Sequence, residues 1–226
     1  MDDTQSISNL IRALFSNTVQ VAVSQELGDV DMLYDEERKL ISHAGQKRQG
    51  EFAAGRLCAM NALEGLGING SPILMDAKGA PIWPDGVIGS ISHAKGCCAA
   101  VVALKEGENS LGLDIEELER VKEDIWNYTF LPEEIDWLRL QSDESSKWAS
   151  VLFGAKEAFY KAQYPLTQSW LGFKDVVIEV DQEEGTFSVR LLLDFGAWSQ
   201  DEVFSGKYAF FDDYVAAGIN LTQGFR

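Results

Sequence analysis

The sequence of 226 residues predicts a fold that mixes α-helices with β-strands. Two long stretches, 35–66 and 148–164, read as helices, and the first has apolar side chains at helical spacing. Four short apolar runs after residue 175 are bounded by turn residues and read as strands. Helices and strands are therefore both expected, in separate stretches of the chain.

The first half is expected to hold one long helix between shorter elements. This helix would begin at Asp35, a plausible N-cap, be interrupted at Gly45 and end at Gly65 and Gly67. The other predicted elements are a helix and a strand within 5–30, a strand at 73–75 with a turn at 76–79, and a segment 87–92 that leads into an apolar strand ending near Leu104. The polar run 105–110 reads as a hairpin loop and forms a natural midpoint.

The second half repeats the general order of strand, helices and strands. Its first strand is expected at 111–116, followed by helical segments over 117–141 that break at Leu131-Pro132. The loop 142–146 can cap the helix 148–164. The remaining strands are predicted at 176–180, 186–193, 203–211 and 215–220, with turns at Glu184-Gly185 and Asp212-Asp213.

The composition argues against several classes of function. The formal net charge is −17, so no basic surplus exists to neutralise nucleic-acid phosphates, and we expect no nucleic-acid partner. No apolar stretch approaches the roughly 18 residues that indicate a membrane span. The acidic start Met1-Asp2-Asp3-Thr4 and the short apolar run 11–15 differ from a secretory signal, so we expect a cytoplasmic protein. Cys58, Cys97 and Cys98 lack zinc-type spacing and are expected to be buried free thiols.

The motifs with the most chemical information are a strand and a helix that carry acidic side chains. In the predicted strand, alternation places Asp114 and Glu116 on one face. In the predicted helix, Glu157 and Lys161 are four residues apart and are neighbours on one face, with Lys156 beside them. Three carboxylates suit a hard divalent cation such as Mg²⁺, and lysines supply positive charge for phosphates. Each pattern alone is more typical of a solvated surface, so the prediction depends on their occurring together.

A third segment adds side chains that suit a phosphate. Ser92 and His93 precede the apolar run 97–104, and a hydroxyl and an imidazole at the mouth of a buried strand can hydrogen-bond phosphate oxygens. Together these motifs resemble the Sfp-type 4′-phosphopantetheinyl transferases, and within them the enterobactin synthetase component D branch. The motifs, in the order of the family, are Gly55-Arg56, Pro81-Ile82-Trp83-Pro84, Gly89-Ser90-Ile91-Ser92-His93, Gly112-Leu113-Asp114-Ile115-Glu116 and Phe153-Gly154-Ala155-Lys156-Glu157-Ala158-Phe159-Tyr160-Lys161.

The resemblance implies a fold and a division of the chain. The family fold is α+β, with two similar halves related by a pseudo-two-fold axis. Each half has a small, mainly antiparallel sheet and helices, and the cofactor lies in the cleft between the halves. The implied halves are residues 1–110, with contacts to the 3′-phosphate of coenzyme A and a Ser-His phosphate contact, and residues 111–226, with the metal site and the catalytic helix.

The resemblance also implies a role for each motif residue. Asp114, Glu116 and Glu157 would hold Mg²⁺, with Mn²⁺ as a substitute. Lys156 and Lys161 would neutralise charge on the phosphate oxygens, and Glu157, directly or through a metal-bound water, would accept the proton of the acceptor serine. The residues expected to bind coenzyme A are Arg48, Arg56, Lys78, Ser92, His93, Lys156 and Lys161.

Some of these assignments have plain structural alternatives. Arg48 and Arg56 are eight residues apart, about 80° around a helix, so both can reach one side, where the resemblance places the 3′-phosphate. Solvated arginines are the alternative, as is a solvated lysine for Lys78. Trp170 and Phe173 could line a pantetheine channel or pack in the core.

The implied reaction is transfer of 4′-phosphopantetheine from coenzyme A to a serine of an apo acyl or peptidyl carrier protein, with release of adenosine 3′,5′-bisphosphate. Two alternatives are a metal-dependent hydrolase of a nucleotide pyrophosphate and a protein that only binds coenzyme A or a carrier. We expect a monomer. Carrier proteins are acidic, as is this chain, so docking should depend on apolar contacts. Trp126, Phe130 and Leu131 are predicted to make them, with core packing as the alternative.

Overall fold

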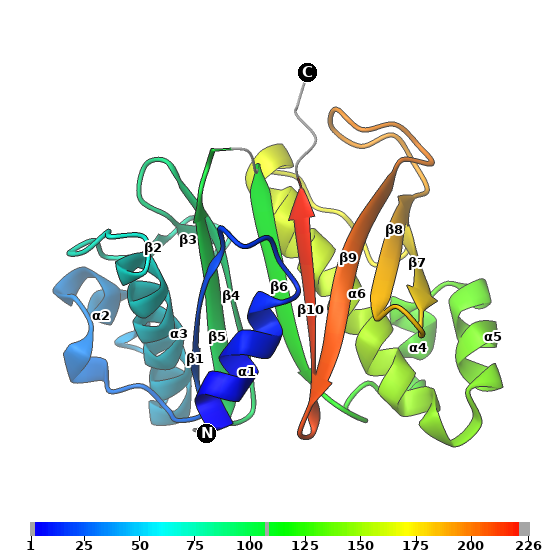
Figure 1. Cartoon of the computed structure of the whole chain (residues 1–226), viewed down its shortest axis with the longest axis horizontal. Coiled ribbons are helices and arrows are strands. Elements are labelled where there is room, and N and C mark those ends of the chain that lie inside the picture. Colours follow the sequence, from blue (N-terminus) through cyan, green and yellow to red (C-terminus); the bar gives the residue numbers. More distant parts are fainter. Residues whose placement is uncertain (1–2, 107–108, 222–226) are drawn as a thin grey trace.

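The computed structural model of the protein describes residues 3–106 and 109–221 and has the predicted α+β class (Figure 1). One antiparallel sheet has three strands in the order β1-β5-β4, and another has five in the order β6-β10-β9-β8-β7. The strands of the first are β1 (Gln20–Ser24), β4 (Val87–Ala94) and β5 (Cys97–Leu104). Those of the second are β6 (Ser110–Glu117), β7 (Val176–Asp181), β8 (Thr186–Leu191), β9 (Val203–Phe211) and β10 (Tyr214–Leu221). A small hairpin joins β2 (Leu74–Met75) to β3 (Pro81–Ile82).

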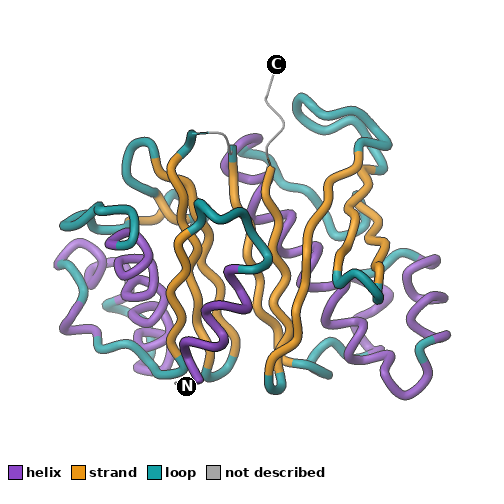
Figure 2. The backbone as a smooth tube through the Cα atoms, viewed as in Figure 1, coloured by secondary structure: helices purple, strands orange, loops and turns teal. Residues whose placement is uncertain are grey.

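The helices lie around these sheets (Figure 2). They are α1 (Asp3–Arg12), α2 (Asp35–Ile41), α3 (Gln46–Glu64), α4 (Glu123–Thr129), α5 (Pro132–Leu140) and α6 (Ser145–Thr167), with short 3₁₀ turns at Val30–Met32 and Ser142–Glu144. The predicted interruption at Gly45 is confirmed, since Gly45 is the N-cap of α3. The predicted N-cap at Asp35 is wrong by one position: Asp35 is the first residue of α2, and Tyr34, with an extended backbone, is the N-cap.

Strand β5 is apolar throughout because helices cover both of its faces. Ala99 and Val101 belong to a core cluster with Ile11 of α1, whereas Ala100 and Val102 pack in a cluster with residues of α3. A strand that is covered on both sides reads as a continuous apolar run, which is the pattern seen in the sequence. The two faces of the three-stranded sheet are thus packed against α1 and α3.

Strand β6 alternates between two environments. Leu111, Leu113 and Ile115 pack in the cluster that includes α1 and β5, so this core extends across the boundary predicted near residue 110. The intervening residues Asp114 and Glu116 face α6, as the alternation predicts. The halves differ in size, with three and five strands in their main sheets, and the pseudo-two-fold axis stays a prediction.

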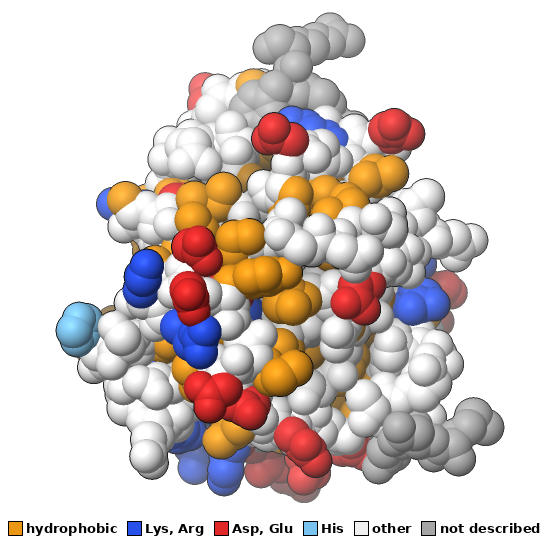
Figure 3. Space-filling view, turned by 90° about the vertical axis from the view of Figure 1, so that its left-hand side faces the viewer, with side chains coloured by type: hydrophobic (Ala, Val, Ile, Leu, Met, Phe, Trp, Pro, Cys, Tyr) orange, Lys and Arg blue, Asp and Glu red, His pale blue; other side chains and the backbone are white. Residues whose placement is uncertain are grey.

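Several expectations about the whole chain can be compared with the structure. Cys58, Cys97 and Cys98 are buried free thiols, as predicted. No helix within residues 3–106 and 109–221 is long and apolar enough to cross a membrane. Figure 3 shows acidic and basic side chains interspersed over one face of the protein.

Candidate active site

The close packing of α6 on β6 sets the position of the acidic side chains. At Gly112, a Cβ atom would lie 1.9 Å from the carbonyl oxygen of Ala158, so only glycine fits at this contact. The contact lies two residues before Asp114 on the strand and one residue after Glu157 on the helix. It therefore holds Asp114 beside the part of α6 that carries Glu157 and Lys161.

Lys161 and Asp114 form an ion pair at this contact. Lys161 Nζ lies 2.7 Å from Asp114 Oδ1, and it also donates hydrogen bonds to Ser92 Oγ at 3.0 Å and to the Leu113 carbonyl oxygen at 3.1 Å. Asp114 is 4% exposed, whereas the Lys161 side chain is 27% exposed. The ammonium group is thus fixed by three protein oxygens and still reaches solvent.

The carboxylates of Asp114, Glu116 and Glu157 share one electrostatic environment. Burial raises the pKa of Glu116 to about 7, with a further rise from Asp114, while Arg120 opposes the shift. Arg120 Nη1 lies 3.4 Å from Glu116 Oε2. Burial and the charge of Asp114 also raise the pKa of Glu157, whereas Lys161 lowers it. The three carboxylates therefore repel one another, and two of them hold protons more tightly than usual.

The chemistry of this donor set suits a divalent cation, but its arrangement is not a ready-made metal site. Asp114 Oδ2 is buried and accepts no hydrogen bond from any residue that the structure describes. Among those residues, no three acidic, histidine or cysteine side chains are grouped so that they could hold a metal ion as they stand. Glu116 and Glu157 would have to change conformation to join Asp114 around a cation, and the metal site stays a prediction.

A cluster of cationic side chains lies near the carboxylates, on α3 and β4. Arg48 Nη1 lies 2.9 Å from His93 Nε2, and both side chains are exposed. Burial, followed by the charge of Arg48, lowers the pKa of His93, while Asp114 raises it. These effects favour the neutral form of the imidazole, which lies next to Arg48.

Arg56 is the buried member of this cluster. It is 5% exposed, and its guanidinium carbon lies 4.5 Å from the ring centre of Phe52. Burial lowers its pKa to about 10, Glu37 raises it and Arg48 lowers it further. Arg56 Nε has no hydrogen-bond partner among the described residues, and no carboxylate there is within 4.0 Å of the guanidinium. A buried cation without a partner of this kind favours an anionic ligand.

Lys156, predicted to neutralise phosphate charge, has its ammonium group bound within the protein. Its side chain is 1% exposed and forms an ion pair of 2.8 Å with Glu134 Oε2. It also donates to the carbonyl oxygens of Phe173 at 2.6 Å and Val176 at 3.0 Å. Burial lowers the pKa of Lys156, and Glu134 raises it. Three protein oxygens bind each of the two lysines, but the Lys156 side chain is 1% exposed and that of Lys161 is 27% exposed. The burial of Lys156 favours a structural link, and its role at the phosphates stays a prediction.

Ser92 lies where β4 meets β6, and its predicted role as a phosphate ligand stays a prediction. It is 3% exposed, and its hydroxyl faces β6. The hydroxyl donates to Asp114 Oδ1 at 3.0 Å and accepts from the Ile115 N–H at 3.0 Å and from Lys161. The hydroxyl is therefore already engaged within the protein. His93, the next residue, faces outward.

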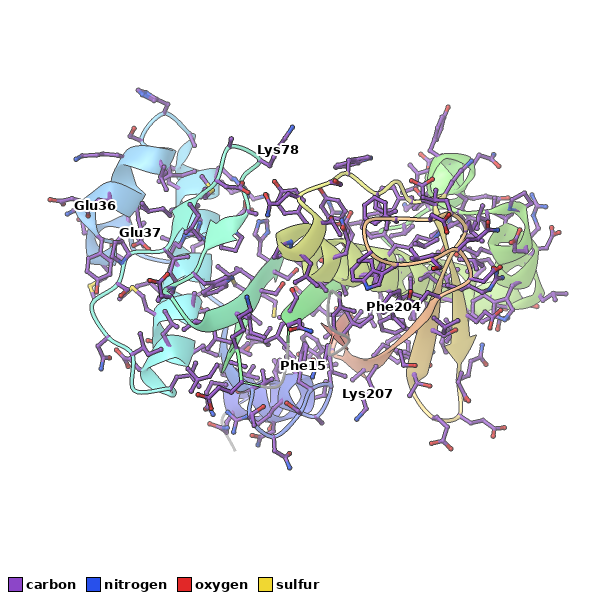
Figure 4. All side chains as sticks on the ribbon, turned by 90° about the horizontal axis from the view of Figure 1, so that it is seen from above. Phe15, Glu36, Glu37, Lys78, Phe204 and Lys207 are labelled. Atoms are coloured by element: carbon purple, nitrogen blue, oxygen red, sulfur yellow. The ribbon has the colours of Figure 1, made fainter. Side chains whose placement is uncertain are left out.

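A cavity of about 250 Å³ lies between the two halves of the chain. Its lining includes Lys78 and Trp83 from the first half and Tyr160, Lys161 and Tyr164 from α6. Lys78 extends from the loop between β2 and β3 (Figure 4) and is exposed, as a solvated turn lysine would be. This cavity joins aromatic walls to two cationic side chains, which suits a nucleotide.

A smaller cavity of about 130 Å³ lies on the other side of Tyr160. Glu157, Trp170 and Phe173 are among its lining residues. The ring of Trp170 lies 5.0 Å from that of Tyr160, and 74% of Trp170 is exposed. The core alternative for Trp170 is therefore wrong, and the channel wall proposed for it and Phe173 stays a prediction.

The largest cavity lies away from these residues. It has a volume of about 830 Å³ and lies between the end of α1 and the face of β7, β8, β9 and β10. Phe15 and Lys207 are among its lining residues, and Figure 4 labels both. It contains none of the predicted site residues, and its size alone does not make it the reactive site.

The predicted docking site on the segment after β6 is wrong for two of its three residues. Trp126 is 4% exposed and Phe130 is fully buried, and both pack in the core against α6. They are four residues apart and so lie on one face, which faces inward. Leu131 is only partly buried. The exposed large apolar side chains of α4 are Tyr128, at 81%, and Ile125, at 37%.

Three side chains that support the site were missed by sequence reasoning. Glu134 forms an ion pair with Lys156. Tyr164, which lines the cavity of about 250 Å³, donates a hydrogen bond of 3.1 Å from its hydroxyl to Asp76 Oδ2. Asp76 and Tyr164 are 88 positions apart, so no local pattern could have paired them. The sequence did contain one signal for Tyr164, because it lies seven residues after Glu157, about two helical turns along the same face.

Buried carboxylates paired with a lysine, an adjacent arginine cluster and a cavity between two halves define an enzyme site for a phosphate-bearing substrate. A family model for the 4′-phosphopantetheinyl transferase N-terminal domain matches residues 36–103, and one for the 4′-phosphopantetheinyl transferase superfamily matches residues 110–217. The chain belongs to this superfamily and is a 4′-phosphopantetheinyl transferase.

Curated relatives agree with this assignment. The 4′-phosphopantetheinyl transferase Svp of Streptomyces mobaraensis is 40% identical over 166 residues, which cover 73% of this chain and 68% of that protein. PptT of Mycobacterium tuberculosis is 34% identical over 196 residues, covering 81% and 86%. Enterobactin synthase component D of Escherichia coli is 33% identical over 150 residues, covering 66% and 69%. The component D branch is thus among the relatives, with lower identity than Svp.

Proposed function

We propose that the protein transfers 4′-phosphopantetheine from coenzyme A to a serine of an apo acyl or peptidyl carrier protein and releases adenosine 3′,5′-bisphosphate. The observation that carries the proposal is the ion pair of Lys161 with Asp114, beside Glu157 and next to the cavity between the halves. It supplies positive charge where a pyrophosphate would lie and a carboxylate where a serine would arrive.

The chemistry requires positioning and charge neutralisation more than covalent catalysis. A serine oxygen attacks the β-phosphorus, and negative charge spreads over the phosphate oxygens in the transition state. Lys161 is held by three protein oxygens, so its charge is already oriented toward that position. The raised pKa of Glu157 makes its carboxylate a stronger base, which suits acceptance of the serine proton.

Asp114, Glu116 and Glu157 are proposed to hold Mg²⁺, or Mn²⁺ in its place. Two observations support this proposal: Asp114 Oδ2 is buried with no hydrogen-bond donor among the described residues, and the carboxylates repel one another. Oxygen donors of this kind suit hard cations. A bound cation would neutralise the carboxylates and the pyrophosphate of coenzyme A together.

The cationic cluster is proposed to bind the nucleotide end of coenzyme A. Arg48 and Arg56 would bind the 3′-phosphate, with His93 next to Arg48. The buried guanidinium of Arg56, whose Nε has no hydrogen-bond partner among the described residues, supports this assignment. Lys78 would contact the nucleotide from the lining of the cavity of about 250 Å³. The polar groups of Lys156 and Ser92 are engaged within the protein, and their contacts with phosphate stay a prediction.

A monomer in the cytoplasm is also proposed. Three buried free thiols support a reducing compartment, where disulfides are rare. Light scattering of the purified protein would test the monomer, since a mass of twice the 25.0 kDa chain would contradict it.

The direct test is mass spectrometry of a purified apo carrier after incubation with coenzyme A, Mg²⁺ and the protein. Carrier that gains phosphopantetheine supports transfer. Free phosphopantetheine supports a hydrolase instead, and neither product supports a binder. Asp114→Ala should abolish transfer while the fold is retained, and Asp143→Ala, which removes an exposed carboxylate, is the matched control. Near-normal transfer by Asp114→Ala at low Mg²⁺ would contradict the metal assignment.

A further inference from the structure

The junction between the two halves is made by serine side chains. Strands β4 and β6 lie side by side, yet they belong to different sheets and share no backbone ladder. Ser90 and Ser92 are two residues apart on β4, so both hydroxyls point to the same side, toward β6. Their spacing matches that of Leu113 and Ile115, whose N–H groups they accept at 3.1 and 3.0 Å. The hydroxyls thus satisfy donors along an edge of β6 that no strand pairs.

The two serines differ in what else they contact. Ser90 Oγ bonds only to the backbone of Leu113, accepting from its N–H and donating to its carbonyl oxygen at 3.5 Å. Ser92 Oγ, in contrast, also contacts the ion pair of Asp114 and Lys161, at 3.0 Å from each. Ser90 therefore joins β4 to β6, whereas Ser92 joins β4 to the side chains of Asp114 and Lys161.

The hydrogen bonds of Ser92 use the full capacity of its hydroxyl group. A serine hydroxyl has one proton to donate and two lone pairs that accept. The proton goes to Asp114 Oδ1, and the lone pairs accept from Ile115 N–H and Lys161 Nζ. Because the group is 3% exposed, a lost bond cannot be replaced freely by water. The position of each of the three partners is consequently tied to the other two.

We propose that Ser92 is a positioning residue, which orients the Asp114 carboxylate and the Lys161 ammonium group from the opposite half of the chain. Asp114 Oδ1 is held by Ser92 and Lys161, so Oδ2 is left facing α6, 3.5 Å from the position of a Cβ at Gly154. This orientation presents Oδ2 to the site of the proposed cation. The inference rests on the proposed function for what the oriented groups do, and on the hydrogen bonds of Asp114 for the orientation.

The test compares Ser92→Ala with Ser90→Ala, which removes a hydroxyl from the same junction without touching Asp114 or Lys161. Because Ser90 also lines the cavity of about 250 Å³, the two variants are compared by kcat and by metal affinity, and not by KM for coenzyme A. Each variant loses one buried hydrogen bond to a β6 N–H, so both should lower Tm by a few degrees, on the order of 2–4 °C. Only Ser92→Ala should lower kcat for carrier modification, by about tenfold or more, because the reactive groups lose their orientation. Its KM for coenzyme A should change less than about threefold.

A second readout does not depend on activity. Titration of Mn²⁺ followed by electron paramagnetic resonance should show weaker binding by Ser92→Ala than by Ser90→Ala, by about tenfold, because Asp114 Oδ2 is no longer oriented. If Ser92→Ala does not fold, Ser92→Cys keeps nearly the same volume with a weak donor and should show the same loss of kcat.

The outcomes separate this inference from the proposed function. Equal kcat and equal Mn²⁺ affinity in the two alanine variants would overturn the positioning role. A raised KM for coenzyme A with unchanged kcat in Ser92→Ala would also overturn it, since that result assigns Ser92 to phosphate binding. Wild-type protein that modifies no apo carrier would contradict the proposed function instead, and the Mn²⁺ comparison would still decide the role of Ser92.

Discussion

Replacing Lys156 by methionine tests whether this lysine links structural elements or binds phosphate. The change keeps an unbranched side chain but leaves the carboxylate of Glu134 without its cation. That carboxylate is 1% exposed and accepts hydrogen bonds from the N–H groups of Leu131 and Ile178, both at 2.8 Å. Breaking a buried pair in this way costs about 3–5 kcal/mol, which lowers Tm by roughly 6–20 °C in a chain of this size.

A second substitution turns this loss into a measurement of the pair itself. Glu134→Gln removes the buried charge, so the double variant Lys156→Met/Glu134→Gln contains neither unpaired ion. Its unfolding free energy should therefore be higher than the sum of the single losses predicts, by roughly 2–3 kcal/mol. The rescue is incomplete, because the Gln amide nitrogen must face one of the two backbone donors. Urea unfolding of the wild type and the three variants measures this coupling.

Activity then separates the two roles of the neighbouring lysines. At a temperature where it is folded, Lys156→Met should keep KM for coenzyme A within about threefold of wild type, because the Lys156 ammonium group is bound by Glu134 and two carbonyl oxygens. Lys161→Met should instead lose kcat by about a hundredfold or more, since it removes positioned charge at the phosphates. If Lys156→Met unfolds like wild type and loses kcat as Lys161→Met does, the reasoning is refuted.

Three further predictions concern the metal, the nucleotide and the carrier. The pKa of Glu116 is raised from 4.5 to about 7, so the folded protein holds this proton more tightly than the unfolded chain does. The contribution of Glu116 to stability should therefore fall as pH rises from about 4.5 through 7. Mn²⁺ affinity should rise over the same range, because a metal ligand must be deprotonated. Calorimetry at several pH values should show a flatter dependence in Glu116→Gln. Arg48→Ala should weaken binding of coenzyme A by roughly 10- to 150-fold and that of dephospho-coenzyme A much less. Equal losses of affinity for the two ligands, or a similar loss in the surface control Arg139→Ala, would contradict a contact between Arg48 and the 3′-phosphate. Trp170→Ala should raise the carrier KM several-fold, whereas Leu140→Ala, at 80% exposure, should not. In wild type this KM should change little between about 25 and about 300 mM NaCl, and a steep rise with salt would contradict apolar docking.

The local periodicity of the sequence was enough to place the carboxylates. Alternation put Asp114 and Glu116 on one face of β6, and the four-residue spacing put Glu157 and Lys161 on one face of α6. The same geometry could have excluded Lys156. At 100° per residue, Lys156 and Lys161 are separated by about 140° around the helix, so both could not face one cleft. The family motif assigns both lysines to the phosphates, whatever this angle.

What periodicity could not supply was the identity of distant partners. Trp126 and Phe130 share a helix face, but only the tertiary structure decides whether that face meets α6 or solvent. Ser92 lies on the face of β4 that meets β6, while His93 lies on the other, as alternation requires. The sequence contained that difference. The contact between Ser92 and Asp114, which are 22 positions apart, could not be predicted in this way, because long-range pairing depends on how two sheets meet.

The net charge of −17 opposes the binding of a polyanion such as coenzyme A. In the proposed site, coenzyme A would bring several phosphate charges toward three carboxylates. Burial, followed by the charge of Asp114, already raises the pKa of Glu116 there to about 7. Lys161 offsets one of these charges, and Arg48 lies next to His93. These cations alone leave the pyrophosphate facing an excess of negative charge at a buried site, where Coulomb repulsion is weakly screened. A divalent cation held by these carboxylates would reduce both repulsions, so coenzyme A and Mg²⁺ should each strengthen binding of the other. Calorimetric titration of coenzyme A with and without Mg²⁺ measures that coupling, and equal affinities would contradict it.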